Sequence, residues 1–507
     1  MSVEQREWSR RTILTSGVAG AGIALWETNA ARALALPRAD PIARDLDAIA
    51  KAAETAIQAG RATGISISVA KGGAILWEGG IGTAARDPAL AATPHTPFCL
   101  ASITKIFTAA AVMRLVEAGK LDLDAPIDRY LPTPLPRSRF ATQAVTLRLL
   151  GGHCGGLPSL FDMFDPKSPP PAINELIHGY GELAYPAGER YEYANLGYSL
   201  LGAAISRATG RDFSDSLNDL VIRPMGLRDT FFDSDRSRMA GAAGRFDENG
   251  NNIPFYLTGT PPSGEVYASA HDLNIFASHM MGITKKGRRP FLGPNALAPF
   301  YAPVSPQRGK AFTTFGWSGL DSNGQRIIIK TGGQPGVSTR LTLLPTQQIS
   351  IAVLSNRNDN RQIVSEITSK IASLLEPGWS DPDYRVDDFS PPNTLPETYE
   401  GSWSGSIRQG GRSEAVSVVI DGGGASRLTV GNAAPRSLRE LTSSSYALEF
   451  SADGGMNDGR DRGAGTRQLA FKLVKRDEQL FGRCLEMFSR PGFTSTMPHI
   501  VSLSRSS

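Results

Sequence analysis

The sequence predicts an α+β fold: a lobe in which helices flank an antiparallel sheet, a mostly helical insertion within that lobe, and a small all-β domain after it. Three observations predict this arrangement. Strand-like sequence lies on both sides of a long segment, at 65–77 and at 326–355. The intervening residues, from about 120 to 300, have helical spacing broken by Pro- and Gly-rich loops. From residue 400 onwards, short alternating runs are separated by glycine clusters.

The first elements follow from their periodicity. Residues 41–60 have the apolar spacing of one amphipathic helix. Residues 65–70 (ISISVA) alternate with a period of two, a Lys-Gly-Gly turn follows, and 74–77 resume the apolar run, so we expect a β-hairpin. Residues 102–119 have helical spacing again, with a glycine at the end that can stop the helix.

Strands return near the end of the lobe. The runs at 326–331, 338–344 and 349–355 are rich in β-branched and apolar residues. A helix is expected over 362–375. These strands and the early hairpin can form one sheet, with the helical segment inserted between its two halves.

The chain is expected to have four parts. Residues 1–35 form an export signal, 36–385 form the lobe just described, 386–399 form a linker, and 400–507 form a small β-barrel or sandwich. Prolines among acidic residues indicate the linker. In the last part the expected strands lie at 416–420, 427–430, 446–450 and 469–474.

The N-terminal segment has the layout of a targeting signal. A basic Arg10-Arg11 pair precedes an uncharged stretch at 12–26, and small residues in Ala-x-Ala register follow at 31–35. The paired arginines resemble a twin-arginine export signal. The uncharged stretch is shorter than the ~20 residues that span a bilayer, so we expect no stable membrane anchor. We therefore expect a periplasmic or secreted protein, with a disordered tail or a short anchor as the alternatives.

Composition excludes several classes of function. The net charge is only +4 over 507 residues, so nucleic acid is not an expected partner. Three cysteines cannot form a disulfide framework. No CxxC or HExxH spacing occurs and the six histidines are scattered, so the sequence gives no support for a metal site or a cofactor. The oligomeric state is left open.

The first candidate motif is Ser102-Ile103-Thr104-Lys105. Serine is a weak nucleophile that needs a base beside it, and positions i and i+3 of a helix share a face. Lys105 would therefore point at Ser102. The alternative is a plain helix-capping serine with a surface lysine. Ser68 and Lys71 have the same spacing, but in a strand these residues face opposite sides, so Lys71 cannot serve Ser68.

The second motif is Tyr193-Ala194-Asn195. A tyrosine is normally protonated, and two nearby lysine charges would favour the phenolate, which is a usable base. The Asn195 amide can donate to a substrate carbonyl and accept from a lysine. The alternative is that Tyr193 and its neighbouring tyrosines are packing residues.

The third motif is Lys330-Thr331-Gly332-Gly333 at the end of a predicted strand. Lys330 can bind a substrate carboxylate and help to hold Tyr193 deprotonated. Thr331 can add a hydroxyl hydrogen bond. The two glycines let a substrate backbone lie against the strand. The alternative is an ordinary strand end followed by a glycine turn.

The three motifs in this order resemble those of serine β-lactamases and penicillin-binding proteins. The tyrosine of the second motif makes the chain similar to the class C β-lactamase and D-alanyl-D-alanine carboxypeptidase branch. The resemblance covers about 45–375 and implies the β-lactamase/transpeptidase-like fold. It also implies that Ser102 forms an acyl-enzyme, that Lys105 and Tyr193 relay its proton, and that backbone N–H groups of Ser102 and Gly333 bind the oxyanion.

The resemblance leaves the substrate open. One hypothesis is an exported hydrolase of β-lactams or D-alanyl peptides, favoured by the Lys-Thr-Gly run. A second is an esterase or D-aminopeptidase, because D-aminopeptidases of this branch carry extra β domains. A third is a non-hydrolytic penicillin-binding sensor. In each case the partner is a small-molecule or peptide substrate.

Overall fold

The computed structural model describes residues 41–506 except 168–169, 285–286, 288, 305–310, 323, 378, 380–398, 423–424, 444–446, 457–464 and 491–492. The expected export signal (1–35) lies outside the described residues. So does the expected linker (386–399), apart from Tyr399.

The main sheet joins the two halves of the predicted lobe. Its strand order is β11-β12-β13-β14-β15-β1-β2-β3, and neighbouring strands are antiparallel. Strand β1 lies between β2 and β15, with Ile65 opposite Ser355, so the early hairpin completes the later strands as predicted. The strands are β1 (Gly64–Lys71), β2 (Ala74–Arg86), β3 (Ala89–Ala91), β11 (Ala311–Thr313), β12 (Ser318–Ser322), β13 (Gln325–Gln334), β14 (Val337–Leu344) and β15 (Ile349–Ser355).

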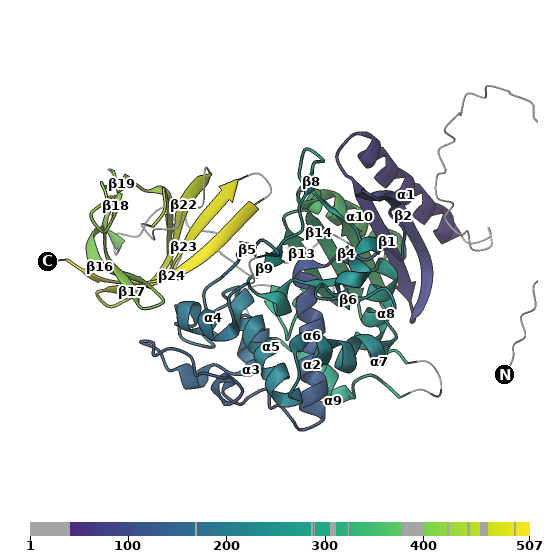
Figure 1. Cartoon of the computed structure of the whole chain (residues 1–507), viewed down its shortest axis with the longest axis horizontal. Helices are drawn as coiled ribbons and strands as arrows, with labels where there is room; N and C mark the ends of the chain where they lie inside the picture. The colour runs from purple at the N-terminus through teal and green to yellow at the C-terminus, as the bar shows by residue number, and fades with distance from the viewer. Residues whose placement is uncertain are drawn as a thin grey trace, which may run out of the picture. The chain divides into compact units, whose positions relative to one another are not determined.

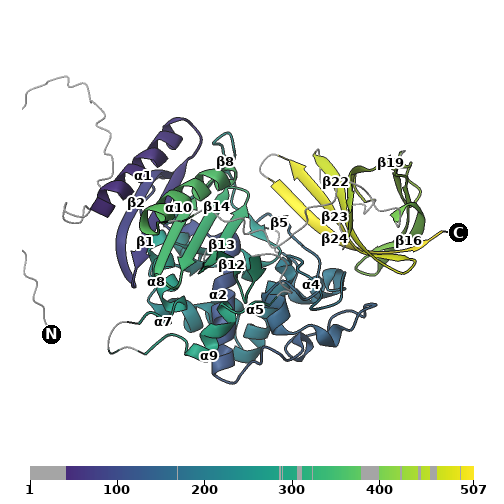
Figure 2. The same cartoon turned by 180° about the vertical axis from the view of Figure 1, so that it is seen from behind.

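Helices α1 (Pro41–Gln58) and α10 (Arg361–Leu375) pack against one face of this sheet and against each other (Figures 1 and 2). Strand β1 turns Ile65, Ile67 and Val69 toward these helices, all fully buried. Each contributes about 1.5–3 kcal/mol by burial. The alternating serines of β1 consequently point to the opposite face.

Helix α2 (Thr104–Glu117) runs through the centre of the lobe and is buried on nearly every side. Phe107 stacks on Phe276 of α8 (Ala270–Met280), with ring centroids 4.3 Å apart, and α8 packs on β1 and β15. A helix that is apolar all round belongs in a core, so α2 provides a fixed base for the residues at its N-terminus.

The segment between the two halves of the sheet is mostly helical, as predicted. Its other helices are α3 (Leu147–Gly151), α4 (Ile173–Tyr180), α5 (Asn195–Thr209), α6 (Phe213–Leu217), α7 (Arg223–Met225) and α9 (Pro294–Leu297). Its short strands are β4 (Phe98–Cys99), β5 (Met163–Phe164), β6 (Phe231–Phe232), β7 (Arg245–Phe246), β8 (Asn252–Ile253), β9 (Leu257–Thr258) and β10 (Val266–Ala268).

The C-terminal region is all-β, as predicted, and forms one nearly closed antiparallel sheet. The order is β19-β18-β17-β16-β24-β23-β22-β21-β20, and β19 at one end contacts β21 near the other. The strands are β16 (Gly401–Gln409), β17 (Arg412–Ile420), β18 (Arg427–Val430), β19 (Arg436–Ser437), β20 (Arg439–Ser443), β21 (Leu448–Asp453), β22 (Thr466–Arg476), β23 (Gln479–Arg490) and β24 (Phe493–Arg505). Fully buried Trp403 and Leu480 belong to its core.

The C-terminal sheet contacts the helical segment through specific groups. The Tyr185 hydroxyl donates to the Lys472 carbonyl at 2.8 Å. Arg483 forms a buried ion pair with Glu192, 2.5 Å between Nε and Oε1. Phe161 and Thr496 form an antiparallel β-bridge. These contacts attach β22, β23 and β24 to the loops that precede α4 and α5.

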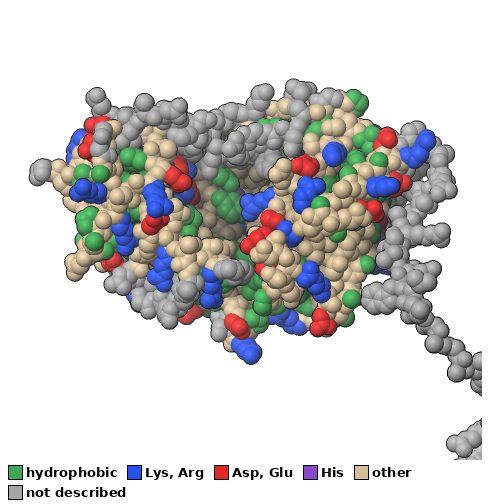
Figure 3. Space-filling view, turned by 90° about the horizontal axis from the view of Figure 1, so that it is seen from above, with side chains coloured by type: hydrophobic (Ala, Val, Ile, Leu, Met, Phe, Trp, Pro, Cys, Tyr) green, Lys and Arg blue, Asp and Glu red, His purple; other side chains and the backbone are tan. Residues whose placement is uncertain are grey.

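Surface charge is mixed in sign. On the face shown in Figure 3, Lys and Arg side chains are interspersed with Asp and Glu, in keeping with the net charge of +4. Within the described ranges, none of the helices combines the length and the apolar character that crossing a membrane requires.

Candidate active site

Ser102 lies in a 3-10 turn (Ala101–Ile103) that leads directly into α2. Ala101 has a φ of 46°, a left-handed conformation that costs a non-glycine residue about 1–3 kcal/mol and is often found at functional sites. Lys105, three residues later, shares the face of Ser102, and its Nζ is 3.1 Å from Ser102 Oγ. The i,i+3 geometry expected from the sequence is therefore present.

Lys105 is completely buried. Its Nζ also donates to the Ser263 carbonyl at 2.9 Å and lies 4.9 Å from the centroid of the Tyr193 ring. Burial, together with the charge of Lys330, holds the pKa of the Lys105 ammonium well below its usual range. An amine with a lowered pKa can accept a proton from the neighbouring serine.

Tyr193 lies just before α5, and its hydroxyl shares a hydrogen bond of 2.7 Å with Ser102 Oγ. Burial raises the pKa of this phenol to about 12, and the hydrogen bond with Ser102 offsets only part of that effect. The sequence reasoning expected lysine charges to favour the phenolate. In the structure the Tyr193 hydroxyl is enclosed, so desolvation has the largest effect on its pKa. Desolvation favours the neutral phenol over the phenolate.

Asn195 is the first residue of α5 and is buried. Its Nδ2 donates to the Leu160 carbonyl at 2.7 Å. One N–H of this amide therefore holds the loop before α4. The side chain also lines the cavity in front of Ser102, where the sequence placed it.

The Lys330–Gly333 run lies on β13, beside the turn that carries Ser102. A Cβ at Gly332 would lie 2.1 Å from the Leu100 carbonyl oxygen and 2.3 Å from Thr339 Oγ1. Only glycine lets this strand approach the turn so closely. Lys330 is buried, and burial lowers the pKa of its ammonium to about 7.

These residues border one cavity of about 750 Å³. The predicted site residues on its wall are Ser102, Tyr193, Asn195, Lys330, Thr331, Gly332 and Gly333. Lys105 lies beneath Ser102 and is absent from the wall. Thr331 is exposed on the strand, so its hydroxyl is accessible. Arg361 of α10 and Thr496 of β24 complete the wall from regions where the sequence predicted no site residue.

His153 is a cavity residue to which the sequence reasoning gave no role. Its ring lies 4.3 Å from that of Tyr193, and its Nδ1 accepts from the Ala194 N–H at 3.2 Å. Burial and the charges of Lys330 and Lys105 hold the pKa of the imidazole well below its usual range. His153 thus acts as a neutral support behind Tyr193. The rings of Tyr191, Tyr193 and Tyr198 surround it in space but lie far from it in the sequence, so sequence spacing gave no signal for this contact.

The second Ser-x-x-Lys pattern does not form a comparable pair. Ser68 is buried on β1 and donates to Glu78 Oε1 at 2.7 Å, whereas Lys71 is exposed at the end of the strand. The strand argument from the sequence correctly separated the two patterns.

Comparison with known proteins places this geometry in a family. The model of the Beta-lactamase family matches residues 49–375. A human (Homo sapiens) beta-lactamase-like protein is 29% identical over 338 residues, which are 63% of this chain and 67% of that protein. Protein flp of Staphylococcus aureus is 24% identical over 337 residues, again 63% of this chain and 67% of that protein.

Solved structures share the fold. A class C beta-lactamase matches with a TM-score of 0.57 and 21% identity, over 66% of this chain and 97% of that one. A beta-lactamase/D-alanine carboxypeptidase from Pseudomonas syringae matches with a TM-score of 0.57 and 21% identity, over 66% of this chain and 99% of that one. SurE matches with a TM-score of 0.62 and 21% identity, over 91% of this chain and 99% of that one. Its likeness therefore extends into the C-terminal β region. With its Ser102–Lys105–Tyr193 cluster, the chain belongs to the Beta-lactamase family, within the superfamily of serine β-lactamases and penicillin-binding proteins.

Proposed function

We propose that the chain is a serine hydrolase that forms an acyl-enzyme through Ser102 on β-lactam or D-alanyl peptide-like amides. One observation carries the proposal: Ser102 Oγ lies within hydrogen-bond distance of two different proton-transfer groups, Tyr193 OH at 2.7 Å and Lys105 Nζ at 3.1 Å. A capping serine with a surface lysine would have neither the buried amine nor the phenol.

Lys105 is the proposed proton acceptor. Its lowered pKa makes the neutral amine accessible, whereas Tyr193 is held as a phenol. In the acylation step Ser102 Oγ bonds to the carbonyl carbon while its proton passes to Lys105. The Tyr193 hydroxyl then donates to the leaving nitrogen as the C–N bond breaks, and the proton on Lys105 restores the phenol. Water reverses the sequence in deacylation.

The cationic side of the cavity favours a substrate with a carboxylate. Lys330 and Arg361 both border the cavity. The Arg361 guanidinium, from α10, lies beside Gly333, which is on the same strand as Lys330. A bound carboxylate would favour the protonated form of Lys330, which burial otherwise opposes. The exposed hydroxyl of Thr331 adds a neutral donor next to these charges.

A second candidate is hydrolysis of peptides or esters with a D-residue, as in a D-aminopeptidase. Two observations favour it: Thr496 of the C-terminal sheet borders the cavity, and SurE, which matches over this region too, has been solved with D-Leu.

The test is a substrate panel of nitrocefin, a short p-nitrophenyl ester and D-alanyl peptides, assayed with the full chain, with Ser102→Ala and with Ser68→Ala. We expect Ser102→Ala to abolish hydrolysis of every accepted substrate. Ser68→Ala, the matched Ser-x-x-Lys control, should retain it. Survival of hydrolysis in Ser102→Ala would refute the proposal. A stable acyl adduct by mass spectrometry, without turnover, would instead indicate the sensor function.

We also propose export through the Arg10-Arg11 pair. Replacing both arginines by lysine keeps the charge and removes the twin-arginine pattern. Cell fractionation of the two forms checks the proposal: the native chain should be periplasmic or secreted, and the double variant should be retained inside the cell.

A further inference from the structure

Two histidines and one glutamate meet on the sheet face opposite α1 and α10. Glu78 projects from β2, His95 lies in the loop between β3 and β4, and His271 is in the first turn of α8. One potential ligand atom from each residue lies within 4.8 Å of those from the other two. None of the three is among the residues that border the active-site cavity.

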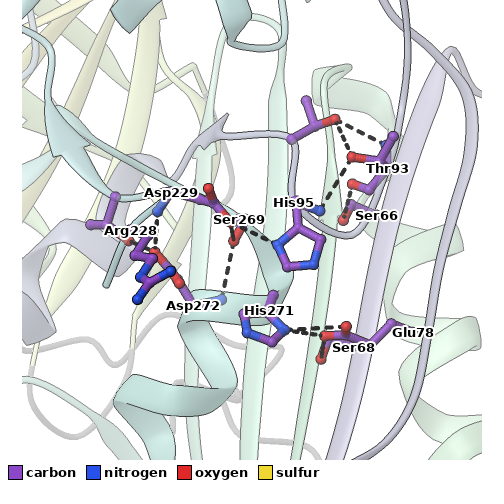
Figure 4. Close-up of polar contacts among 12 residues, drawn as sticks. Ser66, Ser68, Glu78, Thr93, His95, Arg228, Asp229, Ser269, His271 and Asp272 are labelled. Atoms are coloured by element: carbon purple, nitrogen blue, oxygen red, sulfur yellow. Dashed lines mark hydrogen bonds and ion pairs between the residues drawn. The ribbon is translucent and has the colours of Figure 1, made fainter. Parts of the chain in front are cut away.

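The three side chains converge on one point (Figure 4). The imidazole rings of His95 and His271 have centroids 4.5 Å apart and are tilted by 39°. Nδ1 of His271 lies 2.9 Å from Glu78 Oε1. In Figure 4 the ring nitrogen of His95 that is not directed at Asp229 faces His271 and Glu78.

Two of the three convergent groups, His95 and Glu78, are oriented by further partners. Nδ1 of His95 lies 2.8 Å from Asp229 Oδ2; in the tautomer in which Nδ1–H donates to this carboxylate, the Nε2 lone pair is directed away from it and is available to a metal ion. Ser68 donates to Glu78 at 2.7 Å, and Asn274 donates to Ser68 at 2.8 Å. Carboxylate–histidine pairs and hydrogen-bonded ligand carboxylates are the usual outer partners of metal ligands.

We propose that Glu78, His95 and His271 bind a divalent transition-metal ion, with zinc as the best match. Two imidazoles and one carboxylate, with a fourth position open to water, are a common zinc ligand set. The ion would replace the proton between His271 and Glu78 and would join β2, the β3–β4 loop and α8. The proposed function at Ser102 does not depend on this site.

The present geometry is close to a coordinating one. Zinc bonds of about 2.0–2.1 Å in a tetrahedron place neighbouring ligand atoms roughly 3.3 Å apart. The separations of up to 4.8 Å must therefore shorten by at most about 1.5 Å. The His95 side chain is 58% exposed and can move inward, whereas His271 and Glu78 are 27% and 18% exposed and stand on a helix and a strand.

Zinc binding to the full chain, stripped with a chelator, tests the proposal. Isothermal titration should give one equivalent of zinc per chain, and cobalt(II) should give the visible absorption of a four- or five-coordinate ion. The described cysteines are all buried, so thiolates do not compete for the ion. Zinc should also raise the thermal unfolding temperature, because an ion that binds only the folded state stabilises it.

Variants separate this site from adventitious binding. His95→Asn removes an exposed ligand and should abolish the zinc equivalent, and Glu78→Gln should do the same. Asp229→Asn keeps all three ligands and should weaken binding about 10–100-fold. His178→Asn, at an exposed histidine of α4, is the matched control and should bind as the native chain does.

Unfolding temperatures measured with chelator show whether each variant folds. The proposal is overturned if the native chain takes up no zinc. It is equally overturned if folded His95→Asn and Glu78→Gln bind zinc as tightly as His178→Asn. The three residues would then be only a proton-bridged ion-pair cluster.

Discussion

Replacing Gly332 by alanine tests whether the close approach of β13 to the Ser102 turn sets the active-site geometry. The new Cβ would lie 2.1 Å from the Leu100 carbonyl oxygen and 2.3 Å from Thr339 Oγ1, whereas ordinary contacts begin near 3.4 Å. The Leu100 carbonyl belongs to the backbone and cannot rotate away, and Thr339 Oγ1 is held beside it because it donates to this carbonyl at 3.0 Å. The strand must therefore move away by about 1 Å.

A displacement of this size has two measurable effects. A misplacement of about 1 Å at a catalytic centre costs on the order of 100-fold in rate, so kcat/KM for the best panel substrate should fall by that factor. The overpacked strand should lower the free energy of unfolding by about 1–3 kcal/mol. Initial-rate kinetics and urea unfolding measure the two effects on the same preparation.

Two glycines provide the comparison. At Gly333 the added Cβ would meet the Arg361 guanidinium at 2.6 Å, the far end of a flexible side chain that can swing away, so Gly333→Ala should unfold like the native chain. At Gly179, which lies in α4, nothing is within 4 Å, so Gly179→Ala should leave kcat/KM unchanged and should not lower the free energy of unfolding. If Gly332→Ala kept its rate and its stability, the argument that glycine is required there would be refuted.

Three further predictions follow from the buried groups. Burial holds the pKa of Lys330 near 7, so the ammonium loses its proton as the pH rises through about 7. The kcat/KM for carboxylate-bearing substrates should therefore fall over this range relative to that for an uncharged ester. Lys330→Met should remove the difference between the two substrates. His153→Phe deprives the Ala194 N–H of its acceptor and should lower the free energy of unfolding by about 1–3 kcal/mol, which urea unfolding measures. It should also lower kcat by displacing Tyr193, which steady-state kinetics measures. Arg483→Leu leaves Glu192 buried without its partner and should lower the unfolding free energy by about 3–5 kcal/mol, less so with Glu192→Gln added.

The sequence predicted the sheet elements whose periodicity is strong. The alternation of 65–70 gave β1, and the apolar runs after 326 gave β13, β14 and β15 within a few residues. In the C-terminal region β16, β19, β20, β23 and β24 were missed. Strand β16 (GSWSGSIRQ) contains two glycines and five other small or polar residues, and β24 contains a proline, so the composition of these two strands hides their pairing.

The site could be assembled from motifs, but its protonation states could not. The resemblance of the three motifs to those of serine β-lactamases implied that Ser102, Tyr193 and Lys330 would meet in one cleft, and the structure brings them to one cavity. The acidity of Tyr193 depends on how deeply its hydroxyl is enclosed, and no local pattern encodes that burial. The same holds for Glu78, His95 and His271: their wide separation in sequence gave no reason to expect a metal site.

Helix α2 has a consequence for how the protein loses activity on heating. Residues 104–113 are all buried, and the proposed nucleophile, Ser102, lies in the turn that leads into this helix. The amide protons of such a central helix exchange with solvent only when the whole lobe opens. Catalytic activity should consequently be lost at the temperature at which the lobe unfolds cooperatively, without local unfolding around Ser102 at a lower temperature.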